Sequence, residues 1–296
     1  MHTEQLNSRA EKYEIMINSY TPSSLVVTGK LVSSWLEKLL PRGIFKVLFD
    51  VSYTSYRTMI RFLYLRFWLW SLLTGNAKGR LKAKMVFKVM PYSLVGWRGL
   101  EATYDAVLAT QEKKSPGSIV ECGIAQGGSA ALMALLETEA GDQRKIWLFD
   151  SYEGLPDPTD EDFVRGSTGR HVSSMPKGSC LGTYNQVADL LFTKLGLNRE
   201  NIFMVKGWFQ DTLTVSQDKI GQIALLRIDA DWYESVKCCL ENLYDHVSPG
   251  GYVIIDDYGS CFGAQKAVDE FLGRRQVQVE FVHDGRGGCY FLKPGG

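Results

Sequence analysis

The stretch from Ile223 to Asp257 constrains the fold of this chain more than any other part of its sequence. It contains two apolar runs, IALLRI and GYVII, which are joined by an amphipathic segment and a Pro-Gly-Gly turn. Continuous apolar runs are typical of strands buried on both faces of a parallel sheet, and a helix is the usual connection between such strands. We therefore expect two buried parallel strands with a helix between them.

Carboxylates follow both apolar runs. Asp229 and Asp231 come after the first run, and they share one side if the extended backbone continues that far. Asp256 and Asp257 come after the second run, and Gly259 indicates that the chain leaves the sheet there, so that both side chains can converge. Because open α/β sheets bind ligands at the carboxyl ends of their strands, we expect a site at this edge.

Four carboxylates that lie close together repel one another by several kcal/mol, so either some are protonated or a cation lies among them. Oxygen ligands without a His or Cys pair favour a hard ion such as Mg²⁺ or Ca²⁺ over Zn²⁺. The alternative is that Asp231 caps the following helix and that Asp256 or Asp257 makes only turn hydrogen bonds.

Strand and helix patterns alternate after Met85. We predict strands at residues 118–122, 145–150, 201–205, 278–282 and 289–292, and helices at 99–111, from 128, 184–195 and 264–272. HDGRGG between the last two strands reads as a hairpin turn. The alternation predicts an α/β fold: a mostly parallel sheet with helices on both faces and an antiparallel strand near the C-terminus.

A glycine-rich turn connects the strand at 118–122 to the helix that begins near Gly128 and Ser129. Gly123, Gly127 and Gly128 let the backbone approach a ligand, and the helix N-terminus offers N–H groups. The spacing G-x-x-x-G-G does not match the dinucleotide pattern G-x-G-x-x-G, and no P-loop lysine follows. Alone, this turn is a weak signal.

Two acids add to that signal. Asp150 ends the next strand, where it can accept hydrogen bonds from ribose hydroxyls, and Glu121 can meet a cationic group of a ligand. A glycine turn, a ribose-binding acid and a carboxylate for an ammonium group together suit S-adenosylmethionine better than NAD.

Two segments lie outside this regular pattern. The polar stretch from Ser151 to Gly182 is long enough to be a lid, and it contains His171, which we expect to be solvated rather than in contact with substrate. Residues 1–84 form a polar arm and an aromatic, basic segment, with a break at residues 74–84 before a main domain over 85–296. We favour packing of the aromatic segment on the main domain or on a second subunit. The alternative is that it lies on a membrane surface.

Composition excludes several classes of protein. Lys plus Arg equals Asp plus Glu at 33 each, so net charge gives no indication of nucleic-acid binding. The 6 cysteines are scattered without metal-binding spacing, which favours a reducing cytoplasm. We expect neither a signal peptide nor a membrane span, because the first twenty residues have no apolar core and no apolar run is long enough.

Five motifs in order carry a resemblance to a known family over residues 90–271: VECGIAQGGSA, LFDSYEGLPDP, VKGWFQDTL, LRIDADWYES and SPGGYVIIDDYG. The chain resembles the macrocin O-methyltransferase family, the metal-dependent sugar O-methyltransferases of macrolide and aminocoumarin antibiotic pathways. The resemblance implies a Rossmann-like class I methyltransferase sheet with an N-terminal helical extension, S-adenosylmethionine and Mg²⁺ as cofactors, and a homodimer. Its acceptor would be a sugar or glycosylated metabolite with neighbouring hydroxyls.

The resemblance also implies roles for particular residues. The cofactor site would include Glu121, Gly123, Asp150 and Ser151, beside the glycine turn; Asp229, Asp256 and Asp257 would hold Mg²⁺, and Asp231 would be the general base. MPYSLVG, residues 90–96, is similar to the segment that closes over the cofactor.

Two departures from the family pattern affect the expected acceptor. Ala125-Gln126 stands where the family has Trp-Arg, and the aromatic N-terminal segment is longer than expected. The alternatives are therefore a metal-dependent methyltransferase for a catechol or lipid-linked acceptor, or a binding protein that keeps the fold without turnover. The intact acidic cluster argues against the second alternative.

Overall fold

The computed structural model describes residues 77–141, 144–162 and 177–295, together with short pieces and single residues between 39 and 69. Its strands form one sheet in the order β3-β2-β1-β4-β5-β7-β6. The strands are β1 (Ser118–Cys122), β2 (Ile146–Asp150), β3 (Ile202–Lys206), β4 (Ile223–Ile228), β5 (Val247–Ile255), β6 (Val282–His283) and β7 (Cys289–Leu292). Strands β1 to β5 are parallel, and the pairs β5–β7 and β6–β7 are antiparallel.

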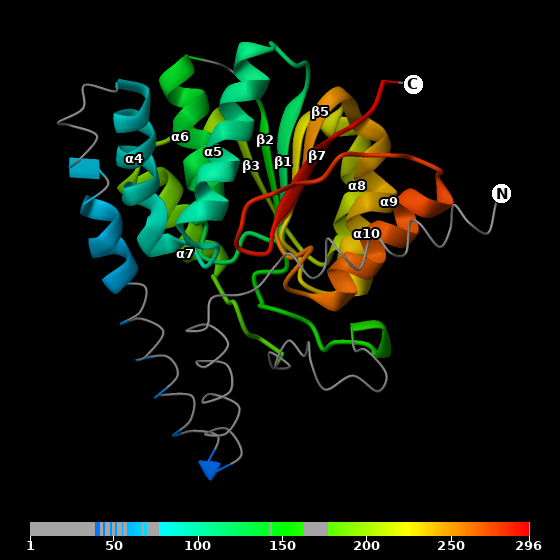
Figure 1. Cartoon of the computed structure of the whole chain (residues 1–296), viewed down its shortest axis with the longest axis horizontal. Coiled ribbons are helices and arrows are strands. Elements are labelled where there is room, and N and C mark those ends of the chain that lie inside the picture. Colours follow the sequence, from blue (N-terminus) through cyan, green and yellow to red (C-terminus); the bar gives the residue numbers. More distant parts are fainter. Residues whose placement is uncertain are drawn as a thin grey trace.

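Helices cover both faces of the sheet (Figure 1). On one side lie α4 (Ala77–Val89), α5 (Gly96–Glu112), α6 (Gly128–Ala140) and α7 (Tyr184–Ala188), and on the other α8 (Phe209–Ile220), α9 (Tyr233–Leu243) and α10 (Phe262–Arg274). A π-helical turn, Asp189–Lys194, continues α7, and short 3₁₀ turns lie at Met90–Tyr92, Asp160–Asp162, Arg199–Asn201 and Tyr244–His246. The α/β class and the mixed sheet agree with the prediction.

The central strands are apolar throughout because both of their faces are covered. Every residue of β1 and of β4 is buried. Ile119 pairs with Leu225 and belongs to the core beneath α4 to α7, whereas the next residues, Val120 and Leu226, belong to the core beneath α8 to α10. Alternation along the strands thus divides the apolar residues between two layers.

The strand order reverses between β1 and β4. β1 pairs with β2 on one side and with β4 on the other, so the loops after β1 and β4 diverge. Ligand sites of open α/β sheets lie at this reversal, outside the carboxyl ends of the strands. The glycine turn after β1 and the carboxylates after β4 and β5 therefore lie at the same edge of the sheet, on either side of this reversal.

Several predicted elements need correction. The expected break at residues 74–84 is wrong for residues 77–84, which belong to α4, a helix that continues past residue 85 and packs on α5 and α6. The helix α8 was not predicted, because its buried face includes Thr212 and Ser216 and therefore lacks a clear apolar period. The strand expected at 278–282 is reduced to Val282–His283.

Part of the aromatic N-terminal segment packs on the main domain. The buried Tyr64 donates a hydrogen bond to Glu101 on α5 at 2.8 Å, and Trp68 stacks on Phe87 of α4. Phe62 and Leu63, in contrast, are exposed. Within the described residues, no helix has the length and apolarity that a membrane span requires. The N-terminal arm, Trp70 and His171 lie outside the described residues.

Candidate active site

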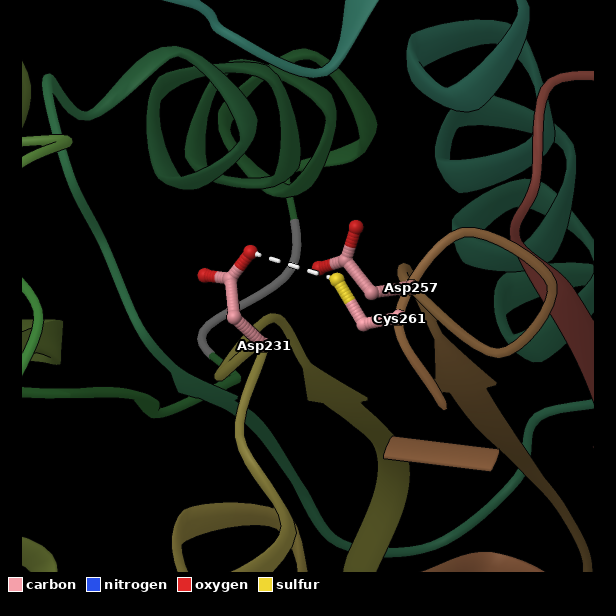
Figure 2. A group of neighbouring side chains, drawn as sticks. All are labelled: Asp231, Asp257 and Cys261. Atoms are coloured by element: carbon pink, nitrogen blue, oxygen red, sulfur yellow. Dashed lines mark hydrogen bonds between the residues drawn. The ribbon is translucent and has the colours of Figure 1, made fainter. Parts of the chain in front are cut away.

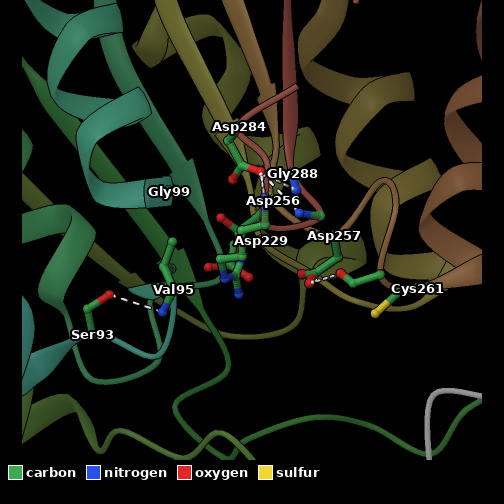
Figure 3. Close-up of polar contacts among 12 residues, drawn as sticks. Ser93, Val95, Gly99, Asp229, Asp256, Asp257, Cys261, Asp284 and Gly288 are labelled. Carbon is green, nitrogen blue, oxygen red and sulfur yellow. Dashed lines mark hydrogen bonds and ion pairs between the residues drawn. The ribbon is translucent and has the colours of Figure 1, made fainter. Parts of the chain in front are cut away.

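Three carboxylates meet at the ends of β4 and β5. Asp229 follows the last residue of β4, and Asp256 and Asp257 follow the last residue of β5. One carboxylate oxygen of each lies within 4.8 Å of the others. Figure 3 shows these side chains next to Asp284 and Gly288 of the turn between β6 and β7. The structure thus brings the three predicted metal ligands together.

A buried arginine lies beneath these acids. Arg227 of β4 is fully buried, and its guanidinium donates to Glu121 Oε1 at 3.0 Å, Asp229 Oδ2 at 2.9 Å and Asp256 Oδ1 at 2.6 Å. A buried charge is tolerated when such partners surround it. Arg227 was not predicted as a site residue, although a basic residue inside the apolar run IALLRI indicates a buried ion pair.

A second arginine reaches the cluster from the hairpin turn. Arg286 donates to Asp256 Oδ2 at 2.8 Å, and its side chain is 31% exposed. Asp284 holds the turn because its Oδ1 accepts from the backbone N–H groups of Arg286, Gly287 and Gly288. No pattern in the sequence pointed to Arg286, because its place depends on the antiparallel pairing of β5 with β7.

The donor set fits a hard divalent cation. Asp257 is 8% exposed; its Oδ1 accepts from the Ser260 hydroxyl, whereas its Oδ2 is buried without a hydrogen-bond partner. Burial, followed by repulsion from Asp231 and Asp256, raises the pKa of Asp257 well above its usual value. Burial and Asp256 likewise raise the pKa of Asp229, more than Arg227 lowers it. A cation that contacts these oxygens would reduce the repulsion among the carboxylates and give Asp257 Oδ2 a partner.

Asp231 lies beside Asp257, close to this set. Its Oδ1 accepts a hydrogen bond from the Cys261 thiol at 3.7 Å, and these two side chains form a second close group with Asp257 (Figure 2). Burial, then the charges of Asp229 and Asp256, raises the pKa of Asp231 to about 7. A carboxylate with this pKa is suited to accept a proton near neutral pH.

Two expectations about Asp231 are wrong. The strand β4 ends at Ile228 and the backbone at Asp231 is left-handed, with a φ of 53°, so Asp229 and Asp231 do not share a strand face. Asp231 is also not the cap of α9, whose N-cap is Trp232. Asp162, 71 residues earlier, instead accepts from the backbone N–H of Tyr233 at 2.6 Å.

The glycine turn packs tightly against the loop after β4. Gly123 has a φ of 88°, and a Cβ there would lie 1.8 Å from the carbonyl oxygen of Asp229. Gly127, also left-handed, is the N-cap of α6, and no side chain caps that helix. The first N–H groups of α6, beginning at Gly128 and Ser129, therefore have no partner within the helix and are available as donors to a ligand.

Of the two predicted cofactor residues at the end of β2, Asp150 contacts the glycine turn and Ser151 does not. Asp150 Oδ2 accepts from the backbone N–H groups of Ile124 at 2.6 Å and Ala125 at 3.1 Å, so the carboxylate orders the glycine turn. The Ser151 hydroxyl turns back to its own loop, where it accepts from the N–H of Glu153 and donates to the carbonyl of Gly154. Direct contacts of Asp150 and Ser151 with a cofactor stay predictions.

Glu121 is more enclosed than expected. It is 1% exposed; one oxygen is bound to Arg227, and the other, Oε2, is buried without a partner. Burial raises the pKa of Glu121 to about 8, because it outweighs the attraction of Arg227. Its predicted contact with a cationic cofactor group stays a prediction.

Two segments cover the glycine turn. Residues 90–96 pass over the start of α6, where a Cβ on Gly128 would lie 2.5 Å from Ser93 Cβ. The end of the predicted lid reaches the other part of the turn, since a Cβ on Gly182 would lie 1.8 Å from the carbonyl oxygen of Ala125. The start of the lid is fixed by Trp232, whose indole N–H donates to the carbonyl of Pro156. Both segments that were predicted to cover the cofactor or to form a lid thus pack against the glycine turn.

A sheet of this strand order, with a glycine turn after β1, an acid at the end of β2 and carboxylates after β4 and β5, is that of a class I methyltransferase. Comparisons with known proteins agree. The family model described as Macrocin-O-methyltransferase (TylF) matches residues 74–293. The chain belongs to this macrocin O-methyltransferase family, and it is an S-adenosylmethionine-dependent O-methyltransferase.

Individual relatives support the same assignment. Demethyldecarbamoylnovobiocin O-methyltransferase from Streptomyces niveus is 34% identical over 203 residues, which is 68% of this chain and 76% of the relative. The 8-demethyl-8-(2,3-dimethoxy-alpha-L-rhamnosyl)-tetracenomycin-C 4'-O-methyltransferase from Streptomyces olivaceus is 32% identical over 184 residues, 62% of this chain and 68% of the relative. The solved structure of the O-methyltransferase NovP has a TM-score of 0.61 and 31% identity, and the match covers 69% of this chain and 83% of that one.

Proposed function

We propose that this protein transfers a methyl group from S-adenosylmethionine to a hydroxyl of a sugar or glycosylated natural product, with Mg²⁺ bound at the acidic cluster. The observation that carries this proposal is the buried, unpartnered Oδ2 of Asp257 within a set of three carboxylates. The relatives named above methylate novobiocin and tetracenomycin compounds according to their names, which supports a natural-product acceptor. An acceptor with two neighbouring hydroxyls suits a metal site of this kind.

The methyl donor would lie along the glycine turn. The free N–H groups at the start of α6 and the carboxylate of Asp150 would hold its polar groups, and residues 90–96 would cover it. Asp150 also fixes the shape of the turn through its hydrogen bonds to Ile124 and Ala125. Enclosure by residues 90–96 and the lid would exclude water from the reacting atoms.

Asp229, Asp256 and Asp257 would hold the cation, which when bound supplies a Lewis acid that lowers the pKa of an acceptor hydroxyl. Asp231 would take the proton from that hydroxyl, since its pKa is raised to about 7 and it lies next to Asp257. The Cys261 thiol holds the Asp231 carboxylate in place through its hydrogen bond. Positioning of the acceptor oxygen by these side chains would supply much of the rate enhancement.

The oligomeric state and location belong to the same proposal. A homodimer in the cytoplasm fits the free state of all six cysteines and the exposed apolar side chains of Phe62 and Leu63. Free thiols persist in reducing compartments.

Calorimetric titration tests the proposal. The purified protein is titrated with S-adenosylmethionine with and without Mg²⁺, and then with a panel of glycosylated diols, a catechol and a lipid-linked sugar. We expect cofactor binding in both conditions, and binding of a glycosylated diol only with Mg²⁺. Absence of cofactor binding in both conditions would refute the proposed reaction, and a preference for the catechol or the lipid-linked sugar would refute the proposed acceptor class.

A further inference from the structure

Both carboxylate oxygens of Asp256 accept hydrogen bonds from arginines. Oδ1 accepts from Arg227 at 2.6 Å, and Oδ2 accepts from Arg286 at 2.8 Å. The same carboxylate belongs to the set, with Asp229 and Asp257, that is arranged for a cation. An arginine and the cation therefore compete for Asp256.

Sharing one oxygen would not remove this competition. An oxygen has two lone pairs, but a guanidinium and a divalent cation on the same oxygen would lie only about 4 Å apart, where like charges repel by several kcal/mol. Binding of the cation therefore favours the departure of one arginine from Asp256.

The structure distinguishes which arginine can leave. Arg227 is fully buried and also donates to Glu121 and Asp229, so its departure would leave its own charge buried and these acceptors without their partner. Arg286 is 31% exposed and extends from a turn whose backbone is held independently by Asp284. Arg286 also attracts Asp257 and Asp229, but rotation of its partly exposed side chain toward solvent would leave the hydrogen bonds of Asp284 within the turn in place.

We propose that Arg286 is a displaceable counter-ion of the metal site: its guanidinium neutralises Asp256 until a divalent cation binds, and then leaves the cluster. This inference rests on the cation site of the proposed function. Arg286 is thus a positioning residue that keeps the acidic cluster together in the metal-free protein. In doing so it weakens the affinity of the site for the cation.

Four proteins test this inference: the wild type, Arg286→Gln, Arg286→Lys and Arg98→Gln, each titrated with Mg²⁺ by calorimetry in the absence of S-adenosylmethionine. Arg98→Gln is the matched control, because Arg98 donates to the carbonyl of Gly285 in the same turn. We expect Arg286→Gln to bind Mg²⁺ about fivefold more tightly, or better, because the competing charge is gone. Arg286→Lys and Arg98→Gln should stay close to the wild type.

Thermal unfolding supplies a readout that does not depend on calorimetry. In EDTA, Arg286→Gln should have a lower Tm than the wild type, because the carboxylates repel one another without their counter-ion. Added Mg²⁺ should raise its Tm more than that of the wild type, since ligand binding to the native state stabilises it according to affinity.

The possible failures are distinguishable. If the wild type does not bind Mg²⁺, the proposed metal-dependent reaction is refuted together with this inference. If the wild type binds Mg²⁺ but Arg286→Gln binds it equally or more weakly, only the inference is overturned. A gain in affinity for Arg98→Gln equal to that of Arg286→Gln would also overturn it, because the gain would then come from a loosened turn.

Discussion

At the scale of single residues, the position of Asp231 shows how backbone shape and chemistry combine. Its left-handed φ of 53° turns the side chain toward Asp257 and Cys261 instead of along the strand. Asp and Asn tolerate this backbone region better than most residues. A change from Asp to Asn at this position therefore removes the basic group with little effect on the backbone.

The first prediction is that Asp231→Asn lowers kcat by a factor of about a hundred to ten thousand, the range typical for loss of a general base. Calorimetry should show that Mg²⁺ and S-adenosylmethionine still bind. Because a base acts only after it has lost its proton, the wild-type rate should rise as pH increases toward neutrality, and the residual rate of the variant should not. Cys261→Ser, which keeps a hydrogen-bond donor to Asp231, is the matched control and should retain most of the activity. Full activity of Asp231→Asn would show that another group takes the proton.

The acids of the site were predictable one by one because each follows an apolar run at the end of a strand. The arginines were not, for different reasons. Arg227 lies within β4, and its partners Glu121 of β1 and Asp256 after β5 are brought to it only by the pairing of the three strands. Arg286 reaches Asp256 through pairing between β5 and β7, which no local pattern specifies.

At the scale of elements, the loop between β1 and α6 is fixed by how closely it approaches the loop after β4. The second prediction concerns Gly123→Ala, because a Cβ at that position would lie 1.8 Å from the carbonyl oxygen of Asp229. We expect a loss of stability of about 2 kcal/mol or more, together with weaker binding of both cofactor and Mg²⁺. Gly141→Ala is the control: its φ of 69° is also left-handed, but no atom lies within 4 Å of its Cβ. Chemical denaturation of both variants makes the comparison, and equal losses would mean that close packing at Gly123 is unimportant.

The third prediction concerns Asp269, a partly buried acid on α10. Burial raises the pKa of Asp269 to about 6, more than the hydrogen bond from Tyr258 lowers it. A folded-state pKa above the unfolded value means that the folded state binds the proton more tightly. The associated stability is thus present below about pH 4 and is lost as pH rises through about 6.

Asp269→Asn removes the cost of keeping a charged carboxylate in this partly buried position. The asparagine side chain can still accept the hydrogen bond from Tyr258. The variant should be more stable than the wild type by about 2 kcal/mol at pH 7.5, with a difference near zero at pH 4. Urea unfolding at both pH values measures this. A pH-independent difference would rule out Asp269 as the source of the effect.

Most elements were predictable because their apolar patterns are clear. The bounds of β1 and β7 agree with the prediction, because each strand is a short, largely apolar stretch that is bounded by turn residues. The pattern at 278–282 was also real, since Val279 and Phe281 are partly buried against the core. It indicates a covered face, however, and only Val282 and His283 gain a strand partner.

At the scale of the whole molecule, the order of the strands determines where the acidic cluster lies, whereas the arrangement of subunits depends on the surface. The fourth prediction is that light scattering coupled to size-exclusion chromatography gives twice the 33.2 kDa mass of one chain. The exposed Phe62 and Leu63 would otherwise remain in contact with water. A monomer that sediments with anionic vesicles would instead favour the membrane-surface alternative for the N-terminal segment.

Synthesis of the chain delivers the partners of Arg227 one at a time. Glu121 leaves the ribosome first, Arg227 and Asp229 follow, and Asp256 emerges last. A nascent chain that assembled β1 against β4 before residue 256 was available would enclose a guanidinium whose partners are incomplete, which is unfavourable by several kcal/mol. We therefore expect β1 and β4 to pair stably only after β5 has been translated. The acidic cluster around Arg227 and the central sheet would then form in the same late step of synthesis.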